Sequence, residues 1–180
     1  MNPLIDKLNE LVASGTPVGF CPYDDGDGMF WGRILEVTET TFRVQQLDVY
    51  GKNEDVEEYE LTLATYFDED PIYAQRLTLL ANFSPTMPEE TNVYSHLKDT
   101  FEFLREARAT GEVVRISFTG TEELDGTITE FSDSWFSITY YNDIMKSKGT
   151  QWVRFGQLKS LTWRNARCEA DGYLLKRQAK

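Results

Sequence analysis

The amino-acid sequence predicts an α+β protein, mainly β with helices, made of two tandem repeats that each place a helix before a small five-stranded barrel. Three observations predict this architecture. Nearly the same pattern occurs twice, about 95 residues apart, which is the length of a duplicated domain. Each copy contains short stretches in which apolar residues alternate with polar ones, as in strands. A stripe of apolar residues at helical spacing, followed by glycine, precedes each set of strands.

The repeat is clearest in two segments of the same length. The segment that begins at Gly32 reads GRILEVTETTFRV, and the segment that begins at Gly126 reads GTITEFSDSWFSI. These segments are 94 positions apart, and upstream of them the separation becomes 96 because the first copy has two extra loop residues. We therefore expect two domains, residues 1–83 and 84–180, that form a pseudo-dimer within one chain.

Each repeat should begin with a helix that ends at a glycine. The first helix has its apolar face at Leu4, Ile5, Leu8, Leu11 and Val12, and the second at Leu97, Phe101 and Leu104. Gly15 and Gly111 stand where helices commonly stop. The strands are expected near 18–21, 30–37, 42–44, 56–61 and 63–67, and again near 114–118, 126–131, 136–140, 152–155 and 158–163. Alternation directs Ile34, Phe42, Ile128 and Phe136 into the cores and Trp135 outward.

This succession resembles the Sm/Lsm-type SH3-like barrel. The residues that carry the resemblance are Val18, Phe20, Gly32, Ile34, Val37, Glu39, Phe42 and Val44 in the first copy, and Val114, Ile116, Phe118, Gly126, Ile128, Phe131, Asp133, Phe136 and Ile138 in the second. Sm proteins bind RNA through an asparagine after the acidic turn residue and through a basic residue before a late glycine. Thr40 and Ser134 follow the acidic residues here, so the resemblance implies the fold alone.

Charge separates the two copies. The chain has a net charge of −12; residues 1–90 hold 18 acidic and 5 basic residues, and residues 91–180 hold 12 and 13. The acidic residues gather in three groups: Asp24, Asp25 and Asp27; Glu54, Asp55, Glu57, Glu58 and Glu60; and Asp68, Glu69 and Asp70. Two interpretations remain open, a solubilising surface and a docking face for a basic partner. Trp135 is either an exposed interface residue or is buried against the first barrel.

Several classes of function lack support in the sequence. No cofactor-binding fingerprint or nucleophile motif occurs, so we expect no enzyme activity, no cofactor and no metal site. His96 has no histidine or cysteine near it, and DDGDG at Asp24 to Gly28 does not fit the EF-hand pattern. We interpret Cys21 as a half-exposed strand thiol and Cys168 as a packing residue near two arginines. No apolar run is long enough for a membrane span, the start is unlike a signal peptide, and the cytoplasm is the expected location.

The leading hypothesis is a non-enzymatic protein-binding module, comparable with small acidic immunity, inhibitor or adaptor proteins. Its site would comprise Asp24, Asp25, Asp27, Glu54, Asp55, Glu57, Glu58 and Trp135, and its partner would be a basic protein. The net charge disfavours nucleic acid as a partner. The alternative is an Sm-like RNA- or DNA-binding regulator that uses Arg115, Lys146, Lys148, Arg154 and Trp135 of the second repeat.

Overall fold

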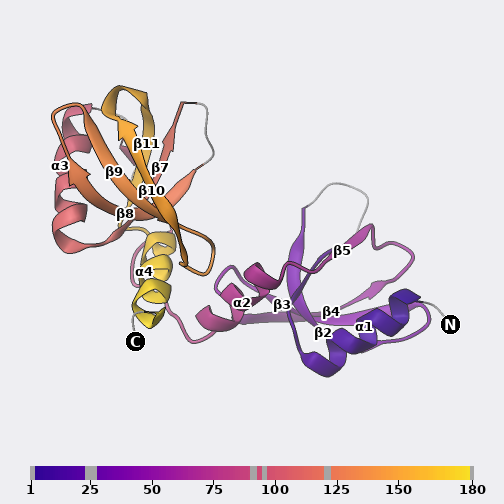
Figure 1. Cartoon of the computed structure of the whole chain (residues 1–180). Coiled ribbons are helices and arrows are strands. Elements are labelled where there is room, and N and C mark those ends of the chain that lie inside the picture. The colour runs from indigo at the N-terminus through magenta and orange to yellow at the C-terminus, as the bar shows by residue number, and fades with distance from the viewer. Residues whose placement is uncertain (1–2, 23–27, 90–92, 95–96, 120–122, 179–180) are drawn as a thin grey trace. The chain divides into compact units, whose positions relative to one another are not determined.

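The computed structural model describes residues 3–22, 28–89, 93–94, 97–119 and 123–178. The chain divides into two compact units, residues 1–82 and 83–180 (Figure 1), where the sequence placed the boundary one residue later. Each unit combines helices with one antiparallel sheet, which confirms the α+β class. Asp24, Asp25 and Asp27 of the expected binding site lie outside the described residues, as does His96, for which no site was expected.

The first unit holds two helices and five strands. In chain order these are α1 (Pro3–Ser14), β1 (Val18–Cys21), β2 (Phe30–Val37), β3 (Thr41–Leu47), β4 (Asn53–Glu60), β5 (Tyr66–Asp68) and α2 (Pro71–Leu80). The strands lie in the order β4-β3-β2-β1-β5, and their pairs are antiparallel.

The second unit repeats this order, with a short strand added before its first helix and a 3-10 turn added before its last long strand. Its elements are β6 (Val93–Tyr94), α3 (Leu97–Thr110), β7 (Val113–Phe118), β8 (Leu124–Phe131), β9 (Trp135–Tyr141), β10 (Ser147–Arg154), the 3-10 turn η1 (Phe155–Gln157), β11 (Leu158–Trp163) and α4 (Ala166–Gln178). The sheet order is β10-β9-β8-β7-β11-β6. Among the described residues, the first and last strands of each sheet are not paired with each other. Closure of each sheet into a barrel therefore stays a prediction.

The two sheets share their register. Val18 pairs with Gly32 in the first unit, and Val114 pairs with Gly126 in the second. The ladder between the second and third strands shifts after Ile34 and after Ile128, which are 94 positions apart. The same separation holds for the edge strands, because Phe42 lies opposite Tyr59 and Phe136 lies opposite Val153. The structure thus determines the register of the fourth strands, which alternation alone left open.

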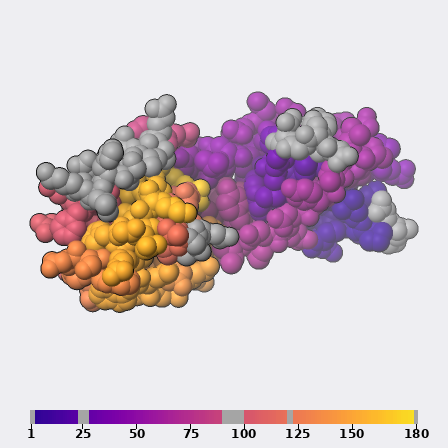
Figure 2. All heavy atoms as spheres, turned by 90° about the horizontal axis from the view of Figure 1, so that it is seen from above, coloured from indigo at the N-terminus to yellow at the C-terminus, as the bar shows by residue number. Residues whose placement is uncertain are grey.

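Each unit has its own core, built where the sequence placed it. Ile34, Phe42, Ile128 and Phe136 are all buried, as predicted. The apolar face of α1 covers β2, and α3 covers β8. Gly15 and Gly111 end these helices with φ of 63° and 66°, a conformation that favours glycine. In the space-filling view, side chains occupy the gaps that the ribbon leaves open within each unit (Figure 2).

Several strand bounds differ from the sequence-based expectation, since β10 begins at Ser147 and not near 152, and β5 begins at Tyr66 and not near 63. Three elements and the exposure of one side chain differ as well. α2, α4 and β6 were not expected, because α2 and α4 have no narrow apolar stripe and β6 has only two residues. Cys21 was interpreted as half-exposed but is buried, since consecutive residues of β1 are covered on both faces. Alternation indicates which face a residue occupies, but not whether a second layer covers that face.

One glycine in each second strand allows the close approach of the next strand. A Cβ on Gly32 would lie 2.8 Å from the carbonyl oxygen of Gln45, and a Cβ on Gly126 would lie 2.5 Å from that of Thr139. Carbon atoms do not approach a backbone oxygen so closely without displacing it, so only glycine fits both positions. Glycine inside a strand commonly marks such a bend or close contact.

We predict that Gly126→Ala destabilises the second unit by about 1–3 kcal/mol, the usual penalty for forcing an extra carbon into a packed site. The obstructing atom belongs to the backbone of β9, which cannot rotate away as a side chain can. Urea unfolding measures the change. Gly156→Ala is the matched control, because no atom lies within 4 Å of its added carbon; its stability should stay within about 0.5 kcal/mol. Equal stabilities would refute the close-contact explanation.

Candidate functional site

β4 is an edge strand that is anchored through a single buried side chain. Every residue of this strand except Tyr59 is exposed. The Tyr59 ring packs against Phe20 and Phe42, with ring centroids 5.5 and 5.6 Å apart, respectively. Its hydroxyl accepts a hydrogen bond from Gln46 Nε2 at 2.6 Å. One aromatic ring therefore holds the strand on the core, and the remaining positions are free to carry solvent-facing groups.

The exposed positions of β4 form an acidic strip, which we define as Glu54, Asp55, Glu57, Glu58 and Glu60. Because side chains alternate, Glu58 and Glu60 share one face of the strand, whereas Glu54 lies where the ladder with β3 shifts register. Among the described residues, no ion pair involves any member of the strip. Arg43 lies opposite Glu58 in the ladder but pairs with Glu36, with a distance of 3.3 Å between nitrogen and oxygen. The negative charge of the strip is thus left uncompensated.

The last acidic group of the first unit has structural partners instead. Glu69 forms an ion pair with Lys7 at 3.1 Å. Asp70 is the N-cap of α2, where its carboxylate accepts hydrogen bonds from the amides of Ile72 and Tyr73 at 2.8 and 3.1 Å. Glu54, Asp55, Glu57 and Glu58 therefore come together on one strand, whereas Glu69 and Asp70 serve the fold.

The edge strand of the second unit has different chemistry at the equivalent positions. At the separation of 94, Glu54, Val56, Glu58 and Glu60 of β4 correspond to Lys148, Thr150, Trp152 and Arg154 of β10. Trp135 on β9 lies opposite Arg154, whose guanidinium is 5.5 Å from the ring centroid of Trp135. Trp135 is 41% exposed, which confirms its outward direction, and Trp152 is 50% exposed. We call Trp135, Trp152 and Arg154 the indole face.

The four cations that the nucleic-acid alternative uses fall into two groups. Lys146, Lys148 and Arg154 are exposed, and within the described parts of the chain they form no ion pair. Arg115 differs, because it donates two hydrogen bonds of 2.7 Å to Asp125 and lies 3.3 Å from Glu123. This bidentate pair is mostly buried, so Arg115 holds β7 to β8 and is not a free phosphate-binding group, contrary to the sequence-based alternative.

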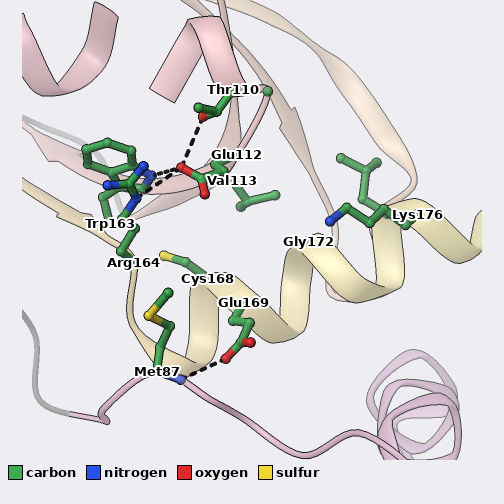
Figure 3. A pocket seen from close by; sticks show the side chains of 12 residues that line it. Met87, Thr110, Glu112, Val113, Trp163, Arg164, Cys168, Glu169, Gly172 and Lys176 are labelled. Carbon is green, nitrogen blue, oxygen red and sulfur yellow. Dashed lines mark hydrogen bonds and ion pairs between the residues drawn. The ribbon is translucent and has the colours of Figure 1, made fainter. Parts of the chain in front are cut away.

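A cavity of about 170 Å³ opens in the second unit, and we call it the α4 cavity (Figure 3). Its walls come from the turn between α3 and β7, the end of β11, the segment at Met87 and one side of α4. Gly172 lines it in the middle of α4, and no atom lies within 4 Å of a Cβ added there. Glycine inside a helix costs roughly 0.5–1 kcal/mol relative to alanine, so the chain leaves open a space that a more favourable residue would occupy.

Glu112 organises one end of the α4 cavity (Figure 3). Its Oε2 accepts hydrogen bonds from Thr110 Oγ1 at 3.0 Å, from Trp163 Nε1 at 3.0 Å and from Arg164 Nε at 3.3 Å. The Arg164 guanidinium lies 4.1 Å from the Trp163 ring centroid and also reaches Glu106 at 2.9 Å. Arg164 has a φ of 53°, which is unfavourable for a residue with a side chain. These contacts hold the corner between β11 and α4 in a strained conformation.

Glu169 fastens the chain segment that forms the opposite wall. Its carboxylate accepts hydrogen bonds from Thr86 Oγ1 at 2.6 Å and from the amides of Thr86 and Met87 at 2.7 and 3.0 Å. Partial burial raises the pKa of Glu169, but these three hydrogen bonds together lower it more, so that it lies below the ordinary value for a glutamate. The segment is therefore held by an ionised carboxylate.

Cys168 is buried beside the cavity and is not an activated nucleophile. Burial raises the pKa of its thiol to about 12, with a further contribution from the nearby charges of Asp171 and Asp125. The burial of Cys168 agrees with its interpretation as a packing residue, and desolvation outweighs the lowering of its pKa by the nearby Arg115. Across the part of the chain that the structure describes, no group of three or more His, Cys, Asp or Glu side chains is placed to hold a metal ion.

The chain was compared with protein-family models and with curated proteins. The chain matches no protein-family model, and no curated protein matches it. The described helices include none that is long and apolar enough to cross a membrane.

Sequence reasoning missed the residues of the α4 cavity because it missed the helix that carries them. Gly172 interrupts the apolar pattern of ARCEADGYLLKRQ, so the segment lacks a helical stripe. An available signal was Ala166, Ala170 and Leu174, which are spaced by four residues and are all buried on α4. Trp163 was expected to complete a strand, and its hydrogen bond to Glu112 depends on a contact between residues 51 positions apart.

We predict that acid releases the segment at Thr86 and Met87 from α4. A carboxylate whose pKa is lowered by folding contributes stability above its unfolded pKa of about 4.3, and that contribution is lost as the pH falls through the lower folded value. Amide resonances of Thr86 and Met87 should therefore titrate below about pH 4.3 in NMR spectra. Glu169→Gln should abolish this titration, and Glu102→Gln, an exposed control on α3, should leave it unchanged. A midpoint above that of an ordinary glutamate would contradict the assignment.

Proposed function

We propose that this protein is a non-enzymatic protein-binding module whose working surface is the acidic strip on β4 and whose partner is a basic protein. One observation carries the proposal. The strip lies on an edge strand, exposed on both faces, and its carboxylates have no ion-pair partners among the described residues. Immunity, inhibitor and adaptor proteins are examples of the class of function meant here.

Two physical properties of an edge strand support binding to an extended basic segment. The outer side of β4 has no neighbouring strand among the described elements, so its backbone can pair with another strand. Lysine or arginine at alternate positions of that strand would meet Glu58 and Glu60, which share a face, and Glu54 and Asp55 add negative charge at the register shift beside them. The same charges would accelerate association with a basic partner, because uncompensated charge steers diffusional encounter.

We also propose that the two units are tandem SH3-like barrels of the Sm type, derived from an internal duplication. The shared register and the equivalent glycines Gly32 and Gly126 support a common origin. The proposal assigns the protein to the cytoplasm, since its two cysteines, Cys21 and Cys168, are buried and form no disulfide with each other. On this view the two edge strands began alike, and β4 became acidic after the duplication.

A second candidate function, single-stranded nucleic-acid binding, rests on the indole face. Two exposed indole rings on one side of a sheet are typical of surfaces on which bases stack, and Lys146, Lys148 and Arg154 could contact phosphates. The net charge of −12 opposes this function, and the residues with which Sm proteins bind RNA have no counterpart in the sequence. We therefore rank it second.

The first test uses a hexapeptide that alternates lysine and valine. At about 50 mM salt it should shift the amide resonances of β3 and β4 and slow hydrogen exchange along β4, as an added strand would. The affinity should fall markedly at about 500 mM salt, because screening shortens the reach of the charges. A matched peptide with glutamate in place of lysine should not bind.

Charge reversal locates the site. Lysine at Glu54, Asp55, Glu57 and Glu58 should abolish peptide binding and leave the thermal midpoint nearly unchanged, because exposed charges contribute little to stability. The control reverses four exposed carboxylates of the second unit, Glu89, Glu102, Glu130 and Asp133, and so changes the net charge equally. Equal loss in both variants would mean that overall charge, and not the acidic strip, attracts the peptide.

A gel-shift titration with single-stranded RNA separates the two candidate functions. We expect weak binding by the unmodified chain and a gain after reversal of the acidic strip. Micromolar binding that Trp135→Ala weakens by about 1–3 kcal/mol, the contribution of one stacked base, would favour the second candidate over the first.

A further inference from the structure

We propose that the α4 cavity is a binding site for a small carboxylic acid with a planar apolar body. The site lies wholly within the second unit and is independent of the acidic strip. Its shape, the state of its polar groups and the position of Lys176 together define the class of ligand.

The cavity is large enough for one ring. Its volume of about 170 Å³ exceeds the roughly 150 Å³ of an engineered apolar cavity that admits benzene. The Trp163 ring and the side chains of Val113 and Leu175 supply apolar wall, and Met87 adds a flexible thioether that adapts to different shapes. A planar apolar group therefore suits the interior.

The polar groups of the walls are already committed, with one exception. Glu112 accepts three hydrogen bonds, and Glu169 accepts three from the segment that forms the opposite wall. Arg164 is bound to both Glu106 and Glu112. Lys176 is the remaining charged group of the lining, and it forms no hydrogen bond or ion pair with a described residue.

The ammonium of Lys176 is directed to the cavity by helix geometry. Lys176 follows Gly172 by four residues, so both lie on one side of α4, and helical side chains lean toward the N-terminus of their helix. Figure 3 shows the Lys176 side chain extending along α4 toward Gly172, where no Cβ interferes. A carboxylate on the ligand would meet this ammonium while its apolar body rests against Val113 and Leu175.

The chemistry of the cavity is that of binding without reaction. The raised pKa keeps the Cys168 thiol protonated at neutral pH, so it is a poor nucleophile. Glu112 and Glu169 are held as hydrogen-bond acceptors by groups of the protein itself. A ligand would instead fasten three parts of the unit, the corner at Arg164, the segment at Met87 and α4, to one another.

The experiment titrates the full chain with benzoate and follows amide resonances by NMR. We expect saturable shifts at Glu112, Val113, Gly172 and Lys176, with a dissociation constant in the millimolar range that suits so small a ligand. Benzamide, which has the same shape without the charge, should bind more weakly. Absence of saturable shifts at these residues would overturn the proposal.

Three variants test the location and the charge separately. Gly172→Leu should fill the cavity and abolish the shifts, and Gly172→Ala, which favours the helix, should weaken binding even if the leucine variant does not fold. Lys176→Gln should weaken benzoate by about 3–5-fold, the effect of one exposed ion pair, and leave benzamide unchanged. Lys146→Gln, an exposed lysine outside the lining, is the control. Binding of benzoate that survives both glycine substitutions, or that is indifferent to Lys176→Gln, would refute the site.

Discussion

The close approach of the second and third strands is the constraint on which both units depend. It requires a residue without a side chain at Gly32 and at Gly126, since an added carbon would lie within 3 Å of a neighbouring carbonyl oxygen. Each of these glycines pairs with the first strand on one side and the third on the other. In each unit the pairing of three strands therefore depends on one glycine. This pairing fixes which residues face the core, among them Phe42 and Phe136.

Because the core residues determine the fold of each unit, the exposed side chains of the edge strands β4 and β10 can differ. Tyr59 on β4 and Val153 on β10 occupy equivalent buried positions and hold the edge strands to the cores. The outward side chains of the same strands make no core contact. The first unit places carboxylates at these positions, and the second places Lys148, Trp152 and Arg154. Because exposed side chains contribute little to folding, one architecture can present surfaces of opposite charge.

The second unit adds a layer that the first lacks. α4 packs against β7 and covers the Arg115–Asp125 pair. The α4 residues Cys168 and Asp171 are buried as well. A bidentate ion pair is tolerated in this position because its hydrogen bonds compensate the loss of water. The same helix leaves the α4 cavity open at Gly172. The first unit ends in α2 instead, whose backbone at Leu77 lies so close to Gly51 that no side chain fits there.

The sequence by itself determined what local periodicity can express. Helices that end at Gly15 and Gly111, the bounds of β2, the buried Phe42 and Phe136 and the outward Trp135 all follow from spacing, since period and burial are coupled along one element. Tertiary structure decided the remainder. The pairing of Tyr59 with Phe42, the burial of Cys21, the commitment of Arg115 to Asp125 and the cavity beside α4 each depend on contacts between distant segments. A single sequence carries no direct record of such contacts, because many partners satisfy the same local pattern and only packing in three dimensions selects one of them.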